Sequence, residues 1–330
     1  MSSSAPPVAA PTPPRPTRLV VVAAAGALTL MLTFVGVFLA AFHDPRPNRI
    51  PVAVVGTADE ASTLQSRVDG LGMGTIHAVA VGSPDEARTE VLSQSVQAAV
   101  VPGVDPTEVL VAQAASPIET QTLQLMLGKA VGPISVQDVR PLPAGDSKGL
   151  ATIFIAFGLT TASLAFGSGL SLLGRRARLP VLLGALAGLS VVGGLGVALI
   201  ADLWVGALTG AFWQLAGLAA LLVLAVAATM TGLGRLGGPI GLALGVLVVL
   251  LFGLSSAGGP LGYLMLPDFF RTISQALPTG AAVTAIRHAV YFDTAHIAQP
   301  VLVLEAWAVG GVLALAAGPR IRRALARKGR

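Results

Sequence analysis

The sequence of 330 residues contains no cysteine and has few charged and few aromatic residues. Charged residues make up 11% of the chain and aromatic residues 5%, whereas about a quarter of an ordinary soluble domain is charged. The absence of cysteine excludes disulfides, thiolate metal sites and cysteine nucleophiles. Hydrophobic residues amount to 54%, and 39 glycines add to the apolar share. The composition therefore excludes an ordinary water-soluble protein and favours membrane-embedded helices.

The chain also lacks the motifs of common enzymes. It has no G-x-x-x-x-G-K-[S/T] phosphate loop and no G-x-S-x-G nucleophile elbow. Its four histidines are dispersed without the H-x-x-x-H spacing of a zinc site. The segment 232–237 has the letters of a dinucleotide fingerprint, but its place between two apolar runs predicts a tight turn. We therefore expect no enzymatic activity, no metal and no cofactor.

Long apolar runs predict a polytopic α-helical membrane protein with six transmembrane helices. Residues 1–18 are rich in Ser, Ala and Pro and predict a disordered tail. The uncharged run 19–41 is long enough to span a bilayer and too long for the apolar part of a cleaved signal peptide, which is the competing interpretation. Five further spans are predicted near 150–172, 180–201, 207–231, 239–257 and 297–318.

Residues 42–148 hold most of the charge and alternate strand-like with helix-like patterns. Ile50–Val55 and Ile76–Val81 predict strands, and the S-x-x-E letters of Ser83–Glu86 predict a capped helix start. Further strands are expected at 96–101, 109–112 and 136–139, and a helix at 118–127. This alternation predicts a small α/β domain inserted between the first and second spans.

Lysine and arginine next to the spans predict the orientation. Six spans place 12 basic residues and no acid on one side, from the N-terminal tail, two short loops and the basic tail 319–330. The other side holds nine basic residues and 15 of the 16 acids. By the positive-inside rule, both termini are expected in the cytoplasm and the α/β domain outside. These short clusters fit topology and membrane lipid better than nucleic acid, which we exclude as a partner.

Two polar residues lie inside predicted spans. Glu305 is a candidate intramembrane polar site, because a carboxylate costs several kcal/mol in a bilayer. It predicts a proton site or a polar contact in a substrate path, with a hydrogen bond between helices as the alternative. Gln214 is a similar candidate that is more typical of helix–helix contacts. Small residues four apart predict close helix packing: Gly167 with Ser171, Gly184 with Gly188, and Gly241 with Gly245.

The membrane part 149–318 contains one less apolar segment, 260–292, which predicts a pair of short outer helices, partly re-entrant. Gly258 and Gly259 end the fifth span, and clustered aromatics beside arginines are typical of the outer membrane–water interface. An ordinary amphipathic connector is the alternative. The candidate residues of this outer pair are Pro267, Phe269, Phe270, Arg271, Pro278, Gly280, Arg287 and Tyr291.

These features together resemble the type-2 ABC exporter permeases, in particular the phage-infection-protein-like branch of Gram-positive bacteria. The resemblance covers nearly the whole chain after residue 18 and is sharpest in Val139–Pro143, in Asp146 and in Gly258–Phe292. It implies a bacterial cell membrane location and a homodimer, or a heterodimer with a related permease. It also implies a separate ATP-binding-cassette ATPase that meets the loop containing Arg175, Arg176 and Arg178.

The expected function is therefore that of a permease subunit of an ABC-type exporter. It would move an amphipathic or lipid-like substrate outward while the separate subunit hydrolyses ATP. The alternative is a cell-surface receptor or scaffold protein that binds a ligand through its external domain.

Overall fold

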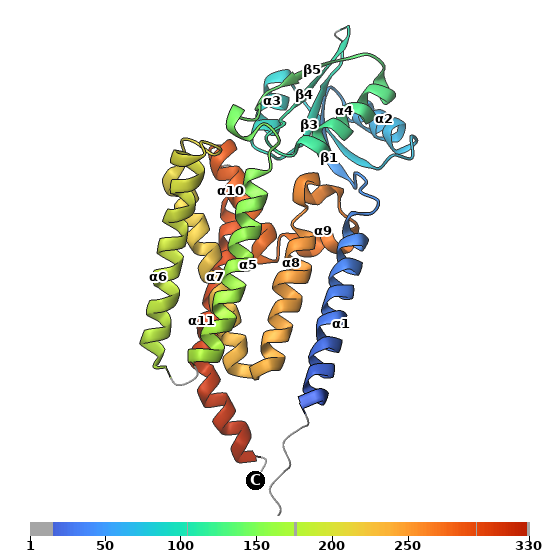
Figure 1. Cartoon of the computed structure of the whole chain (residues 1–330). Helices are drawn as coiled ribbons and strands as arrows, with labels where there is room; N and C mark the ends of the chain where they lie inside the picture. Colours follow the sequence, from blue (N-terminus) through green and yellow to red (C-terminus); the bar gives the residue numbers. More distant parts are fainter. Residues whose placement is uncertain (1–15, 104, 175–176, 295, 329–330) are drawn as a thin grey trace, which may run out of the picture.

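The computed structural model describes residues 16–103, 105–174, 177–294 and 296–328. Figure 1 shows an α/β region at one end of a set of long helices. The first described residues of α1 and the last described residues of α11 lie at the opposite end. Most of the predicted tail 1–18 lies outside the described residues, and its last three residues belong to α1 (Pro16–Phe42).

The α/β region, residues 50–138, is built on one five-stranded sheet in the order β2-β1-β3-β4-β5. Strands β3 and β4 are antiparallel and the other neighbours are parallel. The strands are β1 (Ile50–Val55), β2 (Ile76–Val81), β3 (Ala98–Val101), β4 (Thr107–Val111) and β5 (Ile134–Asp138). The first two strands are confirmed residue for residue, and the other three are displaced by one or two residues from their predicted bounds.

Three helices complete this region: α2 (Ala58–Asp69), α3 (Pro84–Leu92) and α4 (Pro117–Val131). Its core is apolar, and Val52, Leu123 and Met126 have no exposed surface. A second core cluster joins this region to the long helices, because Leu110 of β4 belongs to the same cluster as Leu215 of α7. The α/β region is therefore packed against the helices and is not a separate body on a linker.

Within the described residues, five helices are long and apolar enough to cross a membrane: Ala24–Phe42, Ala151–Leu173, Leu179–Trp204, Phe212–Ser256 and Ala298–Gly318. They belong to α1, α5 (Ala151–Leu173), α6 (Leu179–Ala198) with the π-helix η3 (Leu199–Trp204), α7 (Phe212–Gly245) with η4 (Val246–Phe252) and α8 (Gly253–Ser256), and α11 (Ala298–Lys328). The protein is therefore mostly helical and consistent with a multi-pass membrane protein. The predicted basic tail 319–330 continues α11 as a helix up to Lys328.

The 45-residue segment Phe212–Ser256 folds back on itself. Gly238 has the non-helical angles φ 59° and ψ −135°, and Pro239 follows it. A Cβ atom at Gly245 would lie 2.5 Å from Sδ of Met230, so the residues on either side of the turn are packed together. Figure 1 shows the chain reversing direction between α7 and α8. This reversal falls between the two spans predicted at 207–231 and 239–257.

Glycines allow α5 and α6 to lie directly against the backbone of α7. A Cβ atom at Gly167 of α5 would lie 2.6 Å from the carbonyl oxygen of Ala227, and one at Gly194 of α6 would lie 2.4 Å from that of Ala216. Such approaches allow only glycine. The predicted packing role of Gly184 and Gly188 is wrong, because a Cβ atom at either would meet nothing within 4 Å.

The predicted outer pair forms two helices, α9 (Asp268–Ser274) and α10 (Pro278–Tyr291). The turn between them lies inside the helix bundle, because the Thr279 and Thr160 hydroxyls are hydrogen-bonded at 3.2 Å. Thr160 is nine residues along α5 from Ala151, which corresponds to a depth of about 14 Å. Gly280 keeps this turn tight, since a Cβ atom there would lie 2.1 Å from the Ser274 carbonyl oxygen.

Candidate functional site at the domain junction

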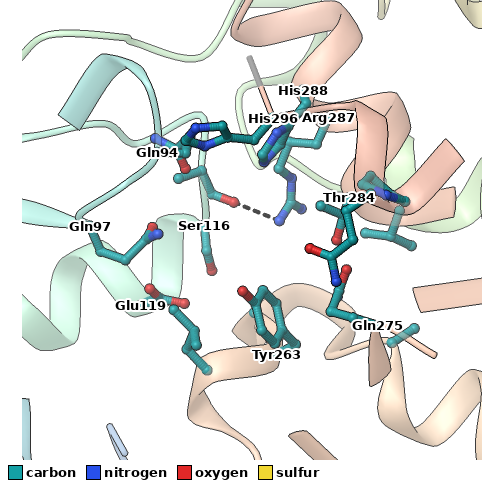
Figure 2. A pocket seen from close by; sticks show the side chains of 17 residues that line it. Gln94, Gln97, Ser116, Glu119, Tyr263, Gln275, Thr284, Arg287, His288 and His296 are labelled. Carbon is teal, nitrogen blue, oxygen red and sulfur yellow. Dashed lines mark hydrogen bonds between the residues drawn. The ribbon is translucent and has the colours of Figure 1, made fainter. Parts of the chain in front are cut away.

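A polar cavity of about 230 Å³ lies where the α/β region meets the helix bundle. Its walls come from the start of α4, from the α3–β3 connection and from α10, together with the segments on either side of α9 and the start of α11. We call it the junction cavity. Figure 2 shows its polar side chains, including Gln97, Ser116, Glu119, Tyr263 and Arg287, around a common space. The site therefore joins residues more than 150 positions apart in the chain.

Ser116 and Glu119 begin helix α4 with the letters of a capping box. Ser116 makes no side-chain cap bond, although it occupies the N-cap position. Both side chains are almost fully buried, at 3% and 4% exposure. Within the described ranges, Oγ of Ser116 and Oε1 of Glu119 have no hydrogen-bond partner. Two polar groups that usually close a helix end are thus buried and unbonded beside the junction cavity.

Burial raises the pKa of Glu119 to about 8, because the charged carboxylate loses its hydration. The positive charge of Arg287 opposes this shift but is the weaker influence. At neutral pH the carboxyl group therefore holds a proton most of the time. The phenol of Tyr263, on the facing wall, also has a raised pKa, first through burial and then through the negative charge of Glu119.

Arg287 of α10 connects the helix bundle to the α/β region. Its guanidinium donates a hydrogen bond of 2.5 Å to the carbonyl oxygen of Ala115, the residue before Ser116. The side chain is buried, and none of the ion pairs within 4 Å in the described chain involves it. Arg287 and Glu119 therefore face the same cavity without direct contact, which leaves room between them.

Asp146 supports Arg287 from the side of α5. Its Oδ1 accepts hydrogen bonds from the backbone N–H groups of Leu150 at 2.9 Å and Ala151 at 3.2 Å, so it caps α5. Its Oδ2 accepts a 2.6 Å hydrogen bond from the hydroxyl of Tyr291. Burial lowers the pKa of Arg287, and the negative charges of Tyr291, Glu119 and the buried Asp146 oppose this shift, so Asp146 partly offsets the charge of the guanidinium.

Gly262 allows the bundle to approach Ser116 and Glu119. Its φ of 80° favours glycine, and a Cβ atom there would lie 2.5 Å from Oε2 of Glu119 and 3.0 Å from Oγ of Ser116. Two other residues of the cavity walls, Gln94 and His296, have φ of 63° and 50°, which is unusual for residues with a side chain. Unusual backbone angles thus occur in cavity walls of both the α/β region and the helix bundle.

The predicted outer pair contributes to the site in part. Arg287 lines the junction cavity, Tyr291 bonds Asp146, and Pro278 and Gly280 are buried where α10 begins. Pro267, Phe269, Phe270 and Arg271 lie at α9, away from the cavity.

At α9 the outer pair is attached to the chain that leads into the sheet. Arg271 donates a 2.7 Å hydrogen bond to the Asn48 carbonyl oxygen and pairs with Asp268 at 2.9 Å. Phe270 packs in a small cluster with Ala41 of α1, whereas Phe269 is exposed. This end of the pair therefore holds α1 and β1 in place and does not form the site.

The other predicted site residues are not brought together. Glu305 lies on the exposed side of α11, and Gln214 is exposed in the first turn of α7. Arg178 is the exposed N-cap residue of α6. Arg175 and Arg176 lie outside the described residues. No candidate metal-binding group of three His, Cys, Asp or Glu side chains occurs in the described part of the chain.

Sequence reasoning missed Ser116, Glu119 and the glutamines of the cavity walls. The S-x-x-E letters at 116–119 gave a signal, but they predict a helix cap and not a buried pair. The apolar segment Val109–Ala112, just before the motif, is a local sign that this helix start could be buried. Contacts with Gly262 and Arg287 come from parts of the chain that no local pattern connects to α4.

A second hollow lies along the helices, between α7, η4 and α11. It measures about 560 Å³ and is lined almost wholly by apolar atoms. Trp307 forms one side and donates a 2.8 Å hydrogen bond from its ring N–H to the Ala276 carbonyl oxygen. Gly310 leaves this wall open, since a Cβ atom there would meet nothing within 4 Å. We call this hollow the apolar groove.

The fold is that of a mostly helical protein, consistent with a multi-pass membrane protein, with an α/β region packed on one end. Comparisons with protein-family models, with curated proteins and with solved structures gave no match to this chain.

Proposed function

We propose that the protein is the permease subunit of an ABC-type exporter that moves an amphipathic or lipid-like substrate outward. In this proposal a separate subunit hydrolyses ATP, and two permease chains, identical or related, form the pathway in a bacterial cell membrane. In the same proposal the chain crosses the membrane six times, with two crossings assigned to the folded-back segment Phe212–Ser256.

The apolar groove is the observation that carries this proposal. It lies between three apolar helical segments, far along them from the sheet, and its lining is nearly free of polar atoms. An acyl chain or another flexible apolar group can leave the lipid and lie there without desolvating any charge. The substrate class that such a groove favours is one with a substantial apolar part.

The distribution of charge along the fold supports the proposed orientation. Arg235 donates a 3.0 Å hydrogen bond to the carbonyl oxygen of Ala177, and a Cβ atom at Gly318 would contact Arg235. The α5–α6 loop, the end of α7 and the end of α11 therefore gather at the end opposite the sheet. Since the basic residues concentrate there, the positive-inside rule puts this end in the cytoplasm, where the ATPase subunit acts.

Groove filling tests the proposal. A side chain at Gly310 would project into the groove without meeting any atom within 4 Å at its Cβ position. Gly310→Leu should therefore reduce transport of a fluorescent phospholipid at least tenfold in proteoliposomes that contain the permease and its ATPase. Gly188→Leu is the matched control, because Gly188 is equally open but lies on the outer side of α6. Equal transport by both variants, or transport that needs no ATP, contradicts the proposal.

The junction cavity favours a second candidate function, that of a receptor or scaffold. An enclosed polar site between an external domain and a membrane bundle is a suitable place for ligand recognition. The two functions differ in one readout. A receptor binds its ligand with the same affinity in the presence and absence of ATPase, and it moves no lipid in the same proteoliposomes.

A further inference from the structure

We propose that the junction cavity is a binding site for one neutral, hydroxyl-rich molecule of monosaccharide size. This inference does not depend on transport, and it concerns a different place from the apolar groove. It rests on unbonded polar groups, on the chemistry of the cavity walls, on their balance of charge and on the available volume.

The unbonded groups are the starting point. Ser116 and Glu119 are buried to more than nine-tenths, yet Oγ of the first and Oε1 of the second have no partner within the described chain. Buried polar atoms in folded proteins almost always have a hydrogen-bond partner, and leaving one without costs about 1–3 kcal/mol. Figure 2 shows both side chains beside the cavity, together with the Tyr263 hydroxyl. A ligand that bonds them would recover that free energy.

The walls present groups that can both donate and accept hydrogen bonds. Four glutamines, Gln94, Gln97, Gln275 and Gln299, line the cavity with Ser116 and Thr284. Amides and hydroxyls pair with ligand hydroxyls in either direction, since each of these groups carries donors and acceptors. A molecule with a hydroxyl on most of its carbon atoms matches such walls on every side.

The charge of the site favours a neutral ligand. Asp146 offsets Arg287, and the raised pKa of Glu119 keeps its carboxyl group protonated at neutral pH. The remaining titratable groups that face the space are Tyr263, His288 and His296. An anion would gain little from a guanidinium whose charge Asp146 already offsets, and a cation would have to remove the proton of Glu119. Neither limit applies to a polyol.

The volume limits the size of the ligand. About 230 Å³ corresponds to roughly eight water molecules at about 30 Å³ each. One pyranose ring with its hydroxyls fits this space, and a disaccharide does not. Each ordered water that such a ligand displaces is replaced by a ligand hydroxyl of similar bonding capacity.

The test is a titration of the full-length protein, solubilised in a detergent without a sugar head group. Isothermal calorimetry would measure D-glucose, D-galactose, D-mannose and N-acetyl-D-glucosamine, with inorganic phosphate, ethylamine and L-alanine as the charged probes. We expect saturable binding of at least one of the four sugars, and binding at least tenfold weaker for each charged probe. Absence of binding by all four sugars, or preferential binding of a charged probe, overturns the proposal.

Substitutions place the binding in this cavity. Gln97→Leu and Ser116→Ala should each weaken binding of the selected sugar at least fivefold, because each removes a wall group without introducing bulk. Glu60→Gln is the matched control and should leave binding unchanged, since Glu60 ends an equivalent motif on the exposed side of the α/β region. Binding that survives both cavity substitutions contradicts this site. Binding is measured without ATP or ATPase, so its loss leaves the proposed transport function intact, and a failure of transport leaves this site intact.

Discussion

Two helices of the α/β region begin with the same S/T-x-x-E motif, but one motif is exposed and the other is buried. At α2, Thr57 accepts a hydrogen bond from the backbone N–H of Glu60, and the Glu60 carboxylate accepts one from that of Thr57 at 2.7 Å. At α4, Ser116 and Glu119 make neither bond. The exposed pair closes a helix, whereas the buried pair faces another part of the protein.

The two glutamates consequently differ in their affinity for a proton. Hydrogen bonds from Thr57 lower the pKa of Glu60, whereas burial raises the pKa of Glu119 to about 8. A third motif, Ser83 with Glu86, resembles the exposed one, because Ser83 accepts a hydrogen bond from the Glu86 N–H and Glu86 accepts one from Gly82. The tertiary environment therefore decides whether an S/T-x-x-E motif is a helix cap or part of a site.

Asp146 is the junction acid with the most partners, and its loss should have the largest effect. Asp146→Ala removes the cap of α5 and leaves Tyr291 and Arg287 without their acceptor and counter-charge. We expect a loss of about 3 kcal/mol in stability, measured by thermal unfolding in detergent, because hydrogen bonds to a charged group contribute about 1.5–3 kcal/mol and a helix cap about 1 kcal/mol. Asp293→Ala is the control, because this 89% exposed side chain pairs with Arg140 at the surface. Its loss should cost less than about 1 kcal/mol, and equal losses would contradict the account.

The pH dependence of stability should differ between the two glutamates. The folded pKa of Glu119, about 8, lies above its usual value of 4.5, so its contribution is complete below about pH 4.5 and is lost as the pH rises through 8. This loss is on the order of 5 kcal/mol. Glu119→Gln should remove it and make the melting temperature flatter between about pH 5 and 9. A decline of equal size in the variant would show that another group titrates.

Glu60 should show the opposite trend. Its folded pKa lies below the usual 4.5, so its contribution is present above that pH and is lost as the pH falls through the folded value. Glu60→Gln should therefore reduce the acid sensitivity of the protein and leave the alkaline side unchanged. The same melting series measures both glutamates, and parallel curves for the two variants would contradict the comparison.

Substitution of each N-cap residue by alanine compares the two helix starts directly, with a smaller expected change in stability. Thr57→Ala should cost about 1 kcal/mol, the usual price of a lost N-cap. Ser116→Ala should cost less than about 0.5 kcal/mol, because Ser116 has no cap bond to lose. Chemical denaturation monitored by tryptophan fluorescence compares the two. A larger loss for Ser116→Ala would show that its hydroxyl has a protein partner after all.

The smallest effect is expected at Glu305. This residue lies on the exposed side of α11 in the single chain, so Glu305→Gln should change stability in detergent by less than about 0.5 kcal/mol. Transport in proteoliposomes is the second readout. Unchanged stability with abolished transport would support a proton or substrate contact at Glu305, whereas unchanged transport would remove it as a site.

The fold was more accessible from sequence than the site. Ile50–Val55 is a continuous apolar run, Ile76–Val81 is interrupted only by His77, and a glycine follows each, so local pattern alone places these strands. The apolar runs of the long helices are equally clear. Gly184 and Gly188 show where pattern fails, because four-residue spacing of small residues does not tell which side of a helix faces a neighbour.

The site required contacts that no local pattern carries. Asp146 and Arg287 were noticed as parts of sequence motifs, but their connection through Tyr291 depends on the fold. The burial of Glu119 could not be predicted from its motif, since the S/T-x-x-E motif that ends at Glu60 forms a true helix cap. The approach of Gly262, 143 positions later in the chain, contributes to the burial of that glutamate, and burial favours its protonated form.

The protonation state of Glu119 is the most direct test of whether its carboxyl group is buried at the junction cavity. Infrared difference spectra of wild type against Glu119→Gln isolate the carboxyl band of this one side chain, and a pH titration gives its midpoint. A midpoint near 8 is expected if the carboxyl group is buried at the junction as described. A midpoint near the usual value of 4.5 would mean that Glu119 is hydrated or paired, and the junction site would then be wrong.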